Sequence, residues 1–190
     1  LHLSLRRQRQ MCIRDRDDPV TRKRGGVLAF HPLRVLELLM RIHIGSDHAG
    51  LEFKNELITH LVMNGHDVTD HGPYEYDALD DYPDFCIPCA EAVAKDSTSV
   101  GIVLGGSGNG EQISANKVKG IRAALVWSLE TAKLAREHNN ANVISVGQRQ
   151  HTAQEVKDFI DLFLATKFPG DERHARRIQK VSNYEITGDL

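Results

Sequence analysis

The sequence contains only three cysteines in 190 residues, too few for a disulfide framework, so a reducing cytoplasm is the predicted location. No apolar run approaches the roughly 20 residues needed to cross a bilayer, so no membrane association is expected. Cys86 and Cys89 form a C-x-x-C pair. Pro83 is well placed to open a helix that contains both thiols, which favours packing in the core over a redox role.

Metal-binding motifs are also missing. The sequence has ten histidines but no H-E-x-x-H segment and no close cluster of histidine and aspartate. His43, His60, His66 and His71 are spread over several predicted elements. We therefore expect no metal ion.

Charge is distributed unevenly along the chain. Residues 1–36 hold nine Lys and Arg against three Asp and Glu, a balance of +6, whereas residues 37–190 carry −8. The acidic body argues against binding to nucleic acid. Residues 1–39 show no sustained period, and part of them resembles translated adapter DNA. We expect 1–39 to be a non-native or disordered N-terminal extension and 40–190 to be a single domain that starts naturally at Met40.

From Met40 onward, short apolar segments alternate with amphipathic ones. Strands are predicted at 40–45, 66–72, 100–106, 121–127 and 141–147. Strands that alternate with helices through short turns imply right-handed crossovers and a parallel sheet covered on both faces. The predicted fold is α/β: a Rossmann-like three-layer α/β/α arrangement with a five-stranded parallel sheet and an extra C-terminal helix.

The helix boundaries follow from capping and breaking residues. Gly65 is expected to end the first helix, Ser128 to cap a helix over 129–137, and Thr152 to cap one that runs to about Ala165. Pro88 lies inside the helix opened by Pro83 and should kink or shorten it.

The segment VGIVLGGSGNGEQISANK, residues 100–117, joins a strand to a helix expected to begin at Glu111. Its glycines allow the backbone amides to approach a ligand, and a helix N-terminus favours negative charge. It lacks the lysine of a P-loop, and Glu111 occupies the third glycine position of a dinucleotide fingerprint. Ser107 and Glu111 add a hydroxyl and a carboxylate to this anion site, which indicates chemistry as well as binding. A tight turn without a ligand is the alternative.

Polar residues follow several predicted strands. Asp47 and His48 come after the first strand, and Arg149 after the fifth. The carboxyl ends of parallel strands meet at one edge of the sheet, so these side chains can converge with the glycine loop in one crevice.

Five segments together resemble the ribose-5-phosphate isomerase B family, within the wider group that includes galactose-6-phosphate isomerase subunits. The resemblance covers roughly 40–185, and in some members the catalytic base is a cysteine where this chain has Glu111. The five segments are GSDHAG at 45–50, DYPDF at 81–85, GGSGNGEQISANK at 105–117, REHNNAN at 136–142 and RHARR at 173–177.

The resemblance implies a cofactor-free aldose-ketose isomerase of the carboxylate-base branch, interconverting ribose 5-phosphate and ribulose 5-phosphate through an enediolate. Glu111 is then the base, His138 opens the sugar ring, and Asp47 assists at the sugar hydroxyls. Ser107 and the amides of 108–110 are the expected oxyanion donors. The helix N-terminus is expected to lower the pKa of Glu111 below its ordinary value.

The family also shares its site across a homodimer, which can assemble further into a tetramer. His138 and Asn139, or the C-terminal arginines, then come from the partner chain. The expected substrate-binding residues, which include the phosphate-binding arginines, are Asp47, His48, Gly106, Ser107, Gly108, Asn109, Gly110, Asn139, Arg149, Arg173 and Arg177.

Simpler interpretations of these residues remain open. His138 suits a cation at a helix C-terminus, Arg173, Arg176 and Arg177 suit a solvated helix face, and Asp47 suits a cap of the following helix. The function has alternatives too. The substrate can be another sugar phosphate, such as allose 6-phosphate, galactose 6-phosphate or a tetrose phosphate, and a non-catalytic phosphosugar-binding module is the alternative from another class.

Overall fold

The computed structural model describes residues 39–190. The predicted non-native extension over 1–39 lies, apart from Leu39, outside the described residues and stays a prediction, as does the single domain over 40–190.

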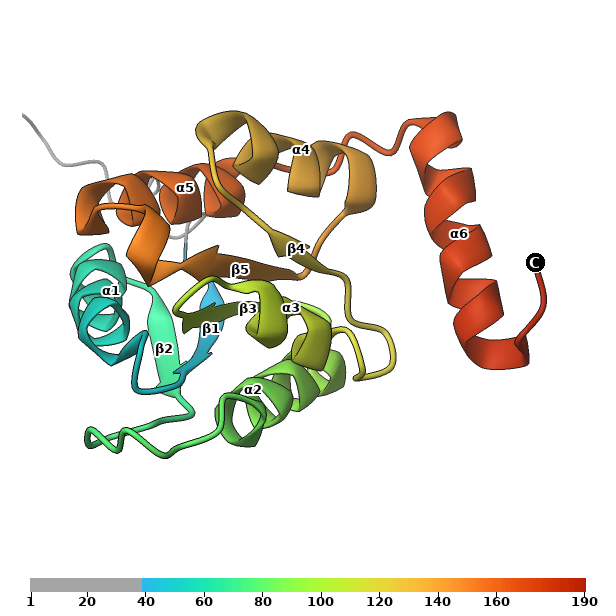
Figure 1. Cartoon of the computed structure of the whole chain (residues 1–190). Coiled ribbons are helices and arrows are strands. Elements are labelled where there is room, and N and C mark those ends of the chain that lie inside the picture. Colours follow the sequence, from blue (N-terminus) through green and yellow to red (C-terminus); the bar gives the residue numbers. More distant parts are fainter. Residues whose placement is uncertain (1–38) are drawn as a thin grey trace, which may run out of the picture. The chain divides into compact units, whose positions relative to one another are not determined.

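All neighbouring strands in the central sheet pair in parallel, in the order β2-β1-β3-β5-β4. Their carboxyl ends therefore open at one edge (Figure 1). The strands are β1 (Arg41–Ser46), β2 (Asp67–Asp70), β3 (Val100–Gly105), β4 (Ala123–Leu125) and β5 (Val143–Gly147). Every residue of β3 and β5 is buried, as expected for central strands covered on both faces.

Two layers of helices cover the sheet (Figure 1). On one face, α1 (Leu51–Met63), α4 (Leu129–Asn139) and α5 (Ala153–Ala165) share a buried cluster with residues of the strands such as Ile44 and Ile144. On the other face, α2 (Pro83–Lys95) and α3 (Asn109–Ala115) pack around Val103 and Val143. The predicted three-layer arrangement is thereby confirmed.

Local signals account for most element boundaries. Ser128 and Thr152 both form capping boxes, with Thr131 and Glu155 respectively, as their positions before helix-forming segments predict. Pro83 occupies the first turn of α2. Pro88 does not end this helix, which continues to Lys95. The prediction that α3 begins at Glu111 is wrong by two residues, because α3 begins at Asn109. Its N-cap is Gly108, whose backbone is left-handed with φ +79°.

The last helix, α6 (Glu172–Thr187), has little core of its own. His174 is its one buried residue, whereas Val181, Tyr184 and Ile186 are each more than half exposed. This is the extra C-terminal helix predicted beyond the regular repeat. Among residues 39–190, no helix has the length and apolar character to span a bilayer.

Candidate functional site

The glycine loop between β3 and α3 depends on close backbone approach. A Cβ atom at Gly108 would lie 2.7 Å from the Leu125 side chain and 2.9 Å from the carbonyl carbon of Val146. The hydroxyl of Ser145 also donates a 2.7 Å hydrogen bond to the Gly108 carbonyl oxygen. The loop is therefore held against β4 and β5, with the amides of the first α3 turn at the carboxyl edge of the sheet.

Glu111 lies under this loop and is only 4% exposed. Its carboxylate occupies the space beside Gly105, where a Cβ would come within 1.7 Å of Oε1. Oε2 is buried and has no hydrogen-bond partner among the described residues. A buried carboxylate oxygen without a partner is poised to exchange a proton with a bound molecule.

The environment of Glu111 corrects one expectation from the sequence. Burial raises the pKa of Glu111, and the nearby charge of Asp47 raises it further. Hydrogen bonds from the backbone amides of Glu111 and Gly108 oppose the shift without reversing it. The predicted lowering is therefore wrong, because desolvation outweighs the helix N-terminus. A carboxylate with a raised pKa is a stronger base once ionised.

Asp47 orders the turn between β1 and α1. Its Oδ1 accepts hydrogen bonds from the amides of Ala49, at 2.9 Å, and Gly50, at 3.2 Å. The interpretation of Asp47 as a cap of the following helix is wrong, because the N-cap of α1 is Gly50 and no side chain caps this helix. Asp47 is buried and close enough to Glu111 to affect its pKa, so the residue also belongs to the site.

The other predicted loop residues surround Glu111. The hydroxyl of Ser107 accepts a 3.3 Å hydrogen bond from the amide of Asn109. Gly110 packs under the ring of Tyr82, where a Cβ would lie 2.6 Å from the ring. Gly106 packs against Arg149, with 3.1 Å from a built Cβ to the guanidinium carbon.

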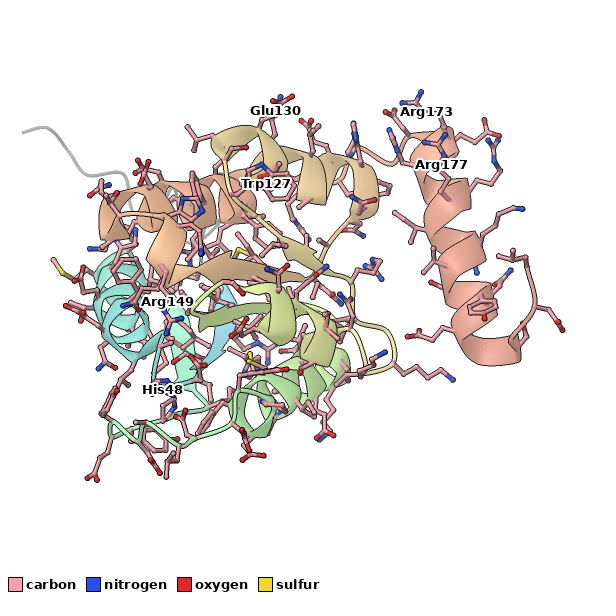
Figure 2. The ribbon with its side chains drawn as sticks, viewed as in Figure 1. His48, Trp127, Glu130, Arg149, Arg173 and Arg177 are labelled. Atoms are coloured by element: carbon pink, nitrogen blue, oxygen red, sulfur yellow. The ribbon has the colours of Figure 1, made fainter. Side chains whose placement is uncertain are left out.

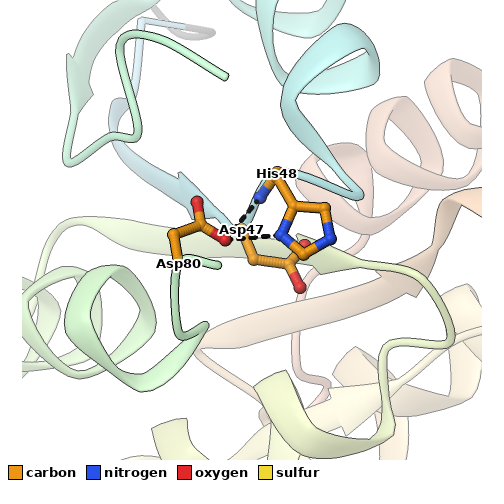
Figure 3. A group of neighbouring side chains, drawn as sticks. All are labelled: Asp47, His48 and Asp80. Atoms are coloured by element: carbon orange, nitrogen blue, oxygen red, sulfur yellow. Dashed lines mark hydrogen bonds and ion pairs between the residues drawn. The ribbon is translucent and has the colours of Figure 1, made fainter. Parts of the chain in front are cut away.

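Two basic side chains lie at this same edge, as Figure 2 shows for His48 and Arg149. The backbone amide of Arg149 donates to the Gly106 carbonyl oxygen at 3.1 Å, which ties the 3₁₀ turn η2 (Gln148–Gln150) to the glycine loop. His48 pairs with Asp80, at 2.6 Å from Nδ1 to Oδ1 (Figure 3). The edge thus offers a place for an anion next to the buried carboxylate.

The remaining predicted residues form a second group around α4 and α6. The rings of His138 and His174 stack with centroids 4.2 Å apart and planes 11° apart. His138, Asn139 and Arg177 line one hollow of about 530 Å³. Arg173 lies beside His174, at 3.2 Å from Nη2 to Nε2.

One chain does not bring these two groups together. The hollow that His138 lines includes neither Glu111 nor Ser107. Figure 2 shows Arg173 and Arg177 on the far side of the molecule from His48 and Arg149. The predicted site residues are therefore divided into a loop group around Glu111 and a helix group around His138.

The C-x-x-C pair takes no part in either group. Cys86 and Cys89 are buried in α2, as predicted, and burial raises the pKa of both thiols, that of Cys89 to about 12. Such thiols stay protonated at neutral pH and are poor nucleophiles.

Ligand atoms of Asp47, His48 and Asp80 lie within 4.8 Å of one another, a spacing that a metal ion can bridge. Nδ1 of His48 already bonds to Oδ1 of Asp80, whereas Oδ2 of Asp80 is buried and has no hydrogen-bond partner among the described residues. The expectation that no metal is needed stays a prediction.

Sequence reasoning assigned no role to Asp80 or Tyr82, although both contact predicted site residues. Tyr82 lies within DYPDF, one of the five segments that carry the family resemblance, and this was the available signal for it. Asp80 lies 32 residues from His48 in a polar loop, and no local pattern connects them.

Fold and site together define the class: a Rossmann-like α/β protein with a buried carboxylate and basic side chains at the carboxyl edge of its sheet. The sequence model of the family described as Ribose/Galactose Isomerase matches residues 42–181. The chain therefore belongs to the ribose/galactose isomerase family.

Individual relatives agree with this assignment. Ribose-5-phosphate isomerase B of Mycolicibacterium paratuberculosis is 55% identical over 148 residues, which cover 78% of this chain and 93% of that protein. The crystal structure of ribose-5-phosphate isomerase B from Mycoplasma genitalium, with bound ribulose-5-phosphate, is 46% identical with a TM-score of 0.76, covering 78% of this chain and 97% of that one. The Clostridium thermocellum enzyme of the same name is 40% identical with a TM-score of 0.75, over 79% and 100% of the two chains.

Proposed function

We propose that this protein is a ribose-5-phosphate isomerase that interconverts ribose 5-phosphate and ribulose 5-phosphate. The observation that carries the proposal is the buried carboxylate of Glu111, whose pKa is raised inside a loop of backbone amides. The similarity to ribose-5-phosphate isomerase B, including a relative with bound ribulose-5-phosphate, supports the choice of substrate.

In the proposed reaction, His138 donates a proton to the ring oxygen as the bond from C1 to that oxygen breaks, and the C1 hydroxyl releases its proton to water and becomes the aldehyde. Glu111 then takes the proton from C2, the C2–H electron pair forms the C1–C2 double bond, and the carbonyl pair moves onto O1 to give the enediolate. The C2 hydroxyl proton passes to O1 as the C2 carbonyl forms, and the double-bond pair takes back the proton from Glu111 at C1. Ser107 and the amides of 108–110 stabilise the oxyanion, each donor contributing about 2 to 4 kcal/mol.

The remaining residues hold the substrate. Asp47 and Asn139 bind the sugar hydroxyls, and Arg149, Arg173, Arg177 and His48 bind the phosphate. Glu111 carries the proton from C2 to C1, and the aldose and ketose are isomers, so the proposed reaction uses neither a metal nor a redox cofactor.

The functional unit is a homodimer with two shared sites, each combining the loop group of one chain with the helix group of the other. Their separation within one chain supports this arrangement, as do the exposed apolar residues of α6. The dimer can assemble further into a tetramer. The setting is the cytoplasm and the non-oxidative branch of the pentose phosphate pathway.

The test is formation of the ketose from ribose 5-phosphate by purified protein, measured beside allose 6-phosphate, galactose 6-phosphate and a tetrose phosphate. We expect the highest kcat/KM for ribose 5-phosphate and its loss in Glu111→Gln. Turnover of another sugar at a higher kcat/KM would reassign the substrate. Binding without turnover would make the chain a phosphosugar-binding module.

A further inference from the structure

His48 is held by one carboxylate through two hydrogen bonds (Figure 3). Oδ1 of Asp80 accepts from Nδ1 of His48 at 2.6 Å and from the His48 backbone amide at 3.1 Å. Asp80 belongs to the loop between β2 and α2, whereas His48 follows β1. The loop therefore determines how the imidazole is presented at the edge of the sheet.

The hydrogen bond to Asp80 assigns the roles of the two ring nitrogens. A carboxylate oxygen accepts, so Nδ1 carries a proton. Nε2 lies on the opposite side of the ring, and none of the hydrogen bonds among the described residues involves it. Nε2 is consequently the nitrogen that His48 can offer to a ligand.

Charges from three elements act on this ring. Asp80 on the loop raises the pKa of His48 most, and Asp47 at the end of β1 adds to the effect. Partial desolvation and the guanidinium of Arg149 in η2 lower it, by less than the two carboxylates raise it. The ring of Tyr76 packs edge-on against the imidazole at 5.8 Å and adds no charge.

His48 and Arg149 lie at one edge of the sheet, and among the described residues neither Nε2 of His48 nor the guanidinium of Arg149 has a hydrogen-bond partner. A phosphate can accept from a guanidinium and an imidazolium together. Within the proposed function, the phosphate of the sugar is the anion present.

We propose that Asp80 is a positioning residue for the phosphate end of the site, fixing the His48 ring so that Nε2–H is directed at the phosphate beside Arg149. This inference rests on the proposed function and on the phosphate-binding role of His48 within it. Asp80 does not contact the substrate itself. It orients the His48 ring and favours its protonated form.

Asp80→Asn is the informative substitution, because it removes the charge and preserves the shape of a side chain that is only 9% exposed. We expect its KM for ribose 5-phosphate to rise about tenfold at about pH 8, because without Asp80 a smaller fraction of His48 is protonated, with kcat changed less than about twofold. As the pH falls, the protonated fraction of the imidazole rises in both proteins, so the two KM values should converge toward acidic pH. A merely structural role would raise KM by the same factor at every pH and would overturn the proposal.

Two variants serve as controls. Asp77→Asn changes a carboxylate in the same loop that accepts from the Leu79 amide, and it should leave the KM profile unchanged. Asp80→Glu retains the charge and should recover part of the affinity at high pH. In a His48→Gln background, Asp80→Asn should have no further pH-dependent effect on KM, and an undiminished effect would contradict the inference.

A second measurement does not require turnover. In nuclear magnetic resonance spectra of the ¹⁵N-histidine-labelled protein, assigned with His48→Gln, the imidazole of His48 should titrate at lower pH in Asp80→Asn than in the wild type. Inorganic phosphate should shift the His48 signals of the wild type at about pH 8, and shift them less in Asp80→Asn. If the wild type shows no isomerase activity, the proposed function fails, while this result still decides whether Asp80 controls an anion site. An unchanged titration, or no response to phosphate, overturns the role of Asp80.

Discussion

Lys54 is completely buried, and its ammonium donates to both carboxylate oxygens of Asp70 at 2.6 Å each. Asp70 ends β2, and its Oδ1 also accepts from the Gly72 amide at 2.8 Å. The pair therefore anchors the start of the loop that carries Asp80 and joins it to α1.

We predict that Lys54→Met destabilises the protein by about 3 kcal/mol, because removing one partner of a buried pair leaves the other charge poorly solvated. The value lies at the lower end of the usual range since Asp70 is 25% exposed. Urea unfolding measures the loss. Lys157→Met is the matched control, since Lys157 pairs with Glu56 at the surface at 2.8 Å, and it should cost no more than about 1 kcal/mol. Equal losses in the two variants would contradict the prediction.

A pair of histidines predicts how stability depends on pH. His43 Nδ1 and His71 Nε2 lie 3.0 Å apart, so one ring must donate and the other must accept. Burial lowers the pKa of both rings, and the charge of His43 lowers that of His71 further.

Both pKa values lie below the ordinary 6.5, so the unfolded chain binds more protons than the folded one below that pH. The stability contributed by the pair is therefore present above pH 6.5 and is lost as the pH falls through the folded pKa values. We predict that His71→Gln loses less free energy of unfolding than the wild type between neutral and mildly acidic pH. Urea denaturation at a series of pH values checks this. If the free energy of unfolding fell with pH equally steeply in His71→Gln and the wild type, the histidine pair would not be the cause of the pH dependence.

Local patterns predict most of the fold. Apolar runs locate all five strands, and Ser128 and Thr152 mark helix starts because capping involves residues only three apart. The expected strand over 121–127 shortens to Ala123–Leu125, since β4 is an edge strand that pairs with β5 alone. The length of an edge strand depends on its pairing with the neighbouring strand, which the local sequence does not reveal.

The site is predicted less completely, for a physical reason. The residue types at positions 47, 107 and 111 indicate their chemistry from the sequence alone. The direction of the pKa shift at Glu111, however, depends on burial against Gly105 and on the charge of Asp47, and these contacts are set by the folded structure. The contact between Asp80 and His48 and the stacking of His138 on His174 also join residues that are far apart in the sequence. Long-range packing decides these features.

The raised pKa of Glu111 predicts the acidic limb of the activity profile. Only the ionised carboxylate can take a proton, so kcat/KM should fall as the pH drops through a pKa above the ordinary glutamate value of 4.5. Asp47→Asn removes a like charge, so the limb should move to lower pH, together with a reduced maximum. Glu111→Gln should lose about 10²-fold or more at every pH. A limb unmoved by Asp47→Asn would contradict the coupling between these carboxylates.

The proposed division of the site between two chains can be tested by mixing inactive variants. Glu111→Gln disables the loop group and His138→Ala the helix group, so each homodimer alone should be nearly inactive. In a mixed dimer, one site combines both defects, while the other combines an intact Glu111 with an intact His138. Random exchange makes half of the dimers mixed, so about a quarter of the sites, and of the wild-type activity, should return.

The double variant Glu111→Gln/His138→Ala mixed with wild type is the control, because every mixed dimer then has two sites with one defect each. No recovery from the mixture of single variants, after subunit exchange is verified by mass spectrometry, would show that each chain forms its site alone.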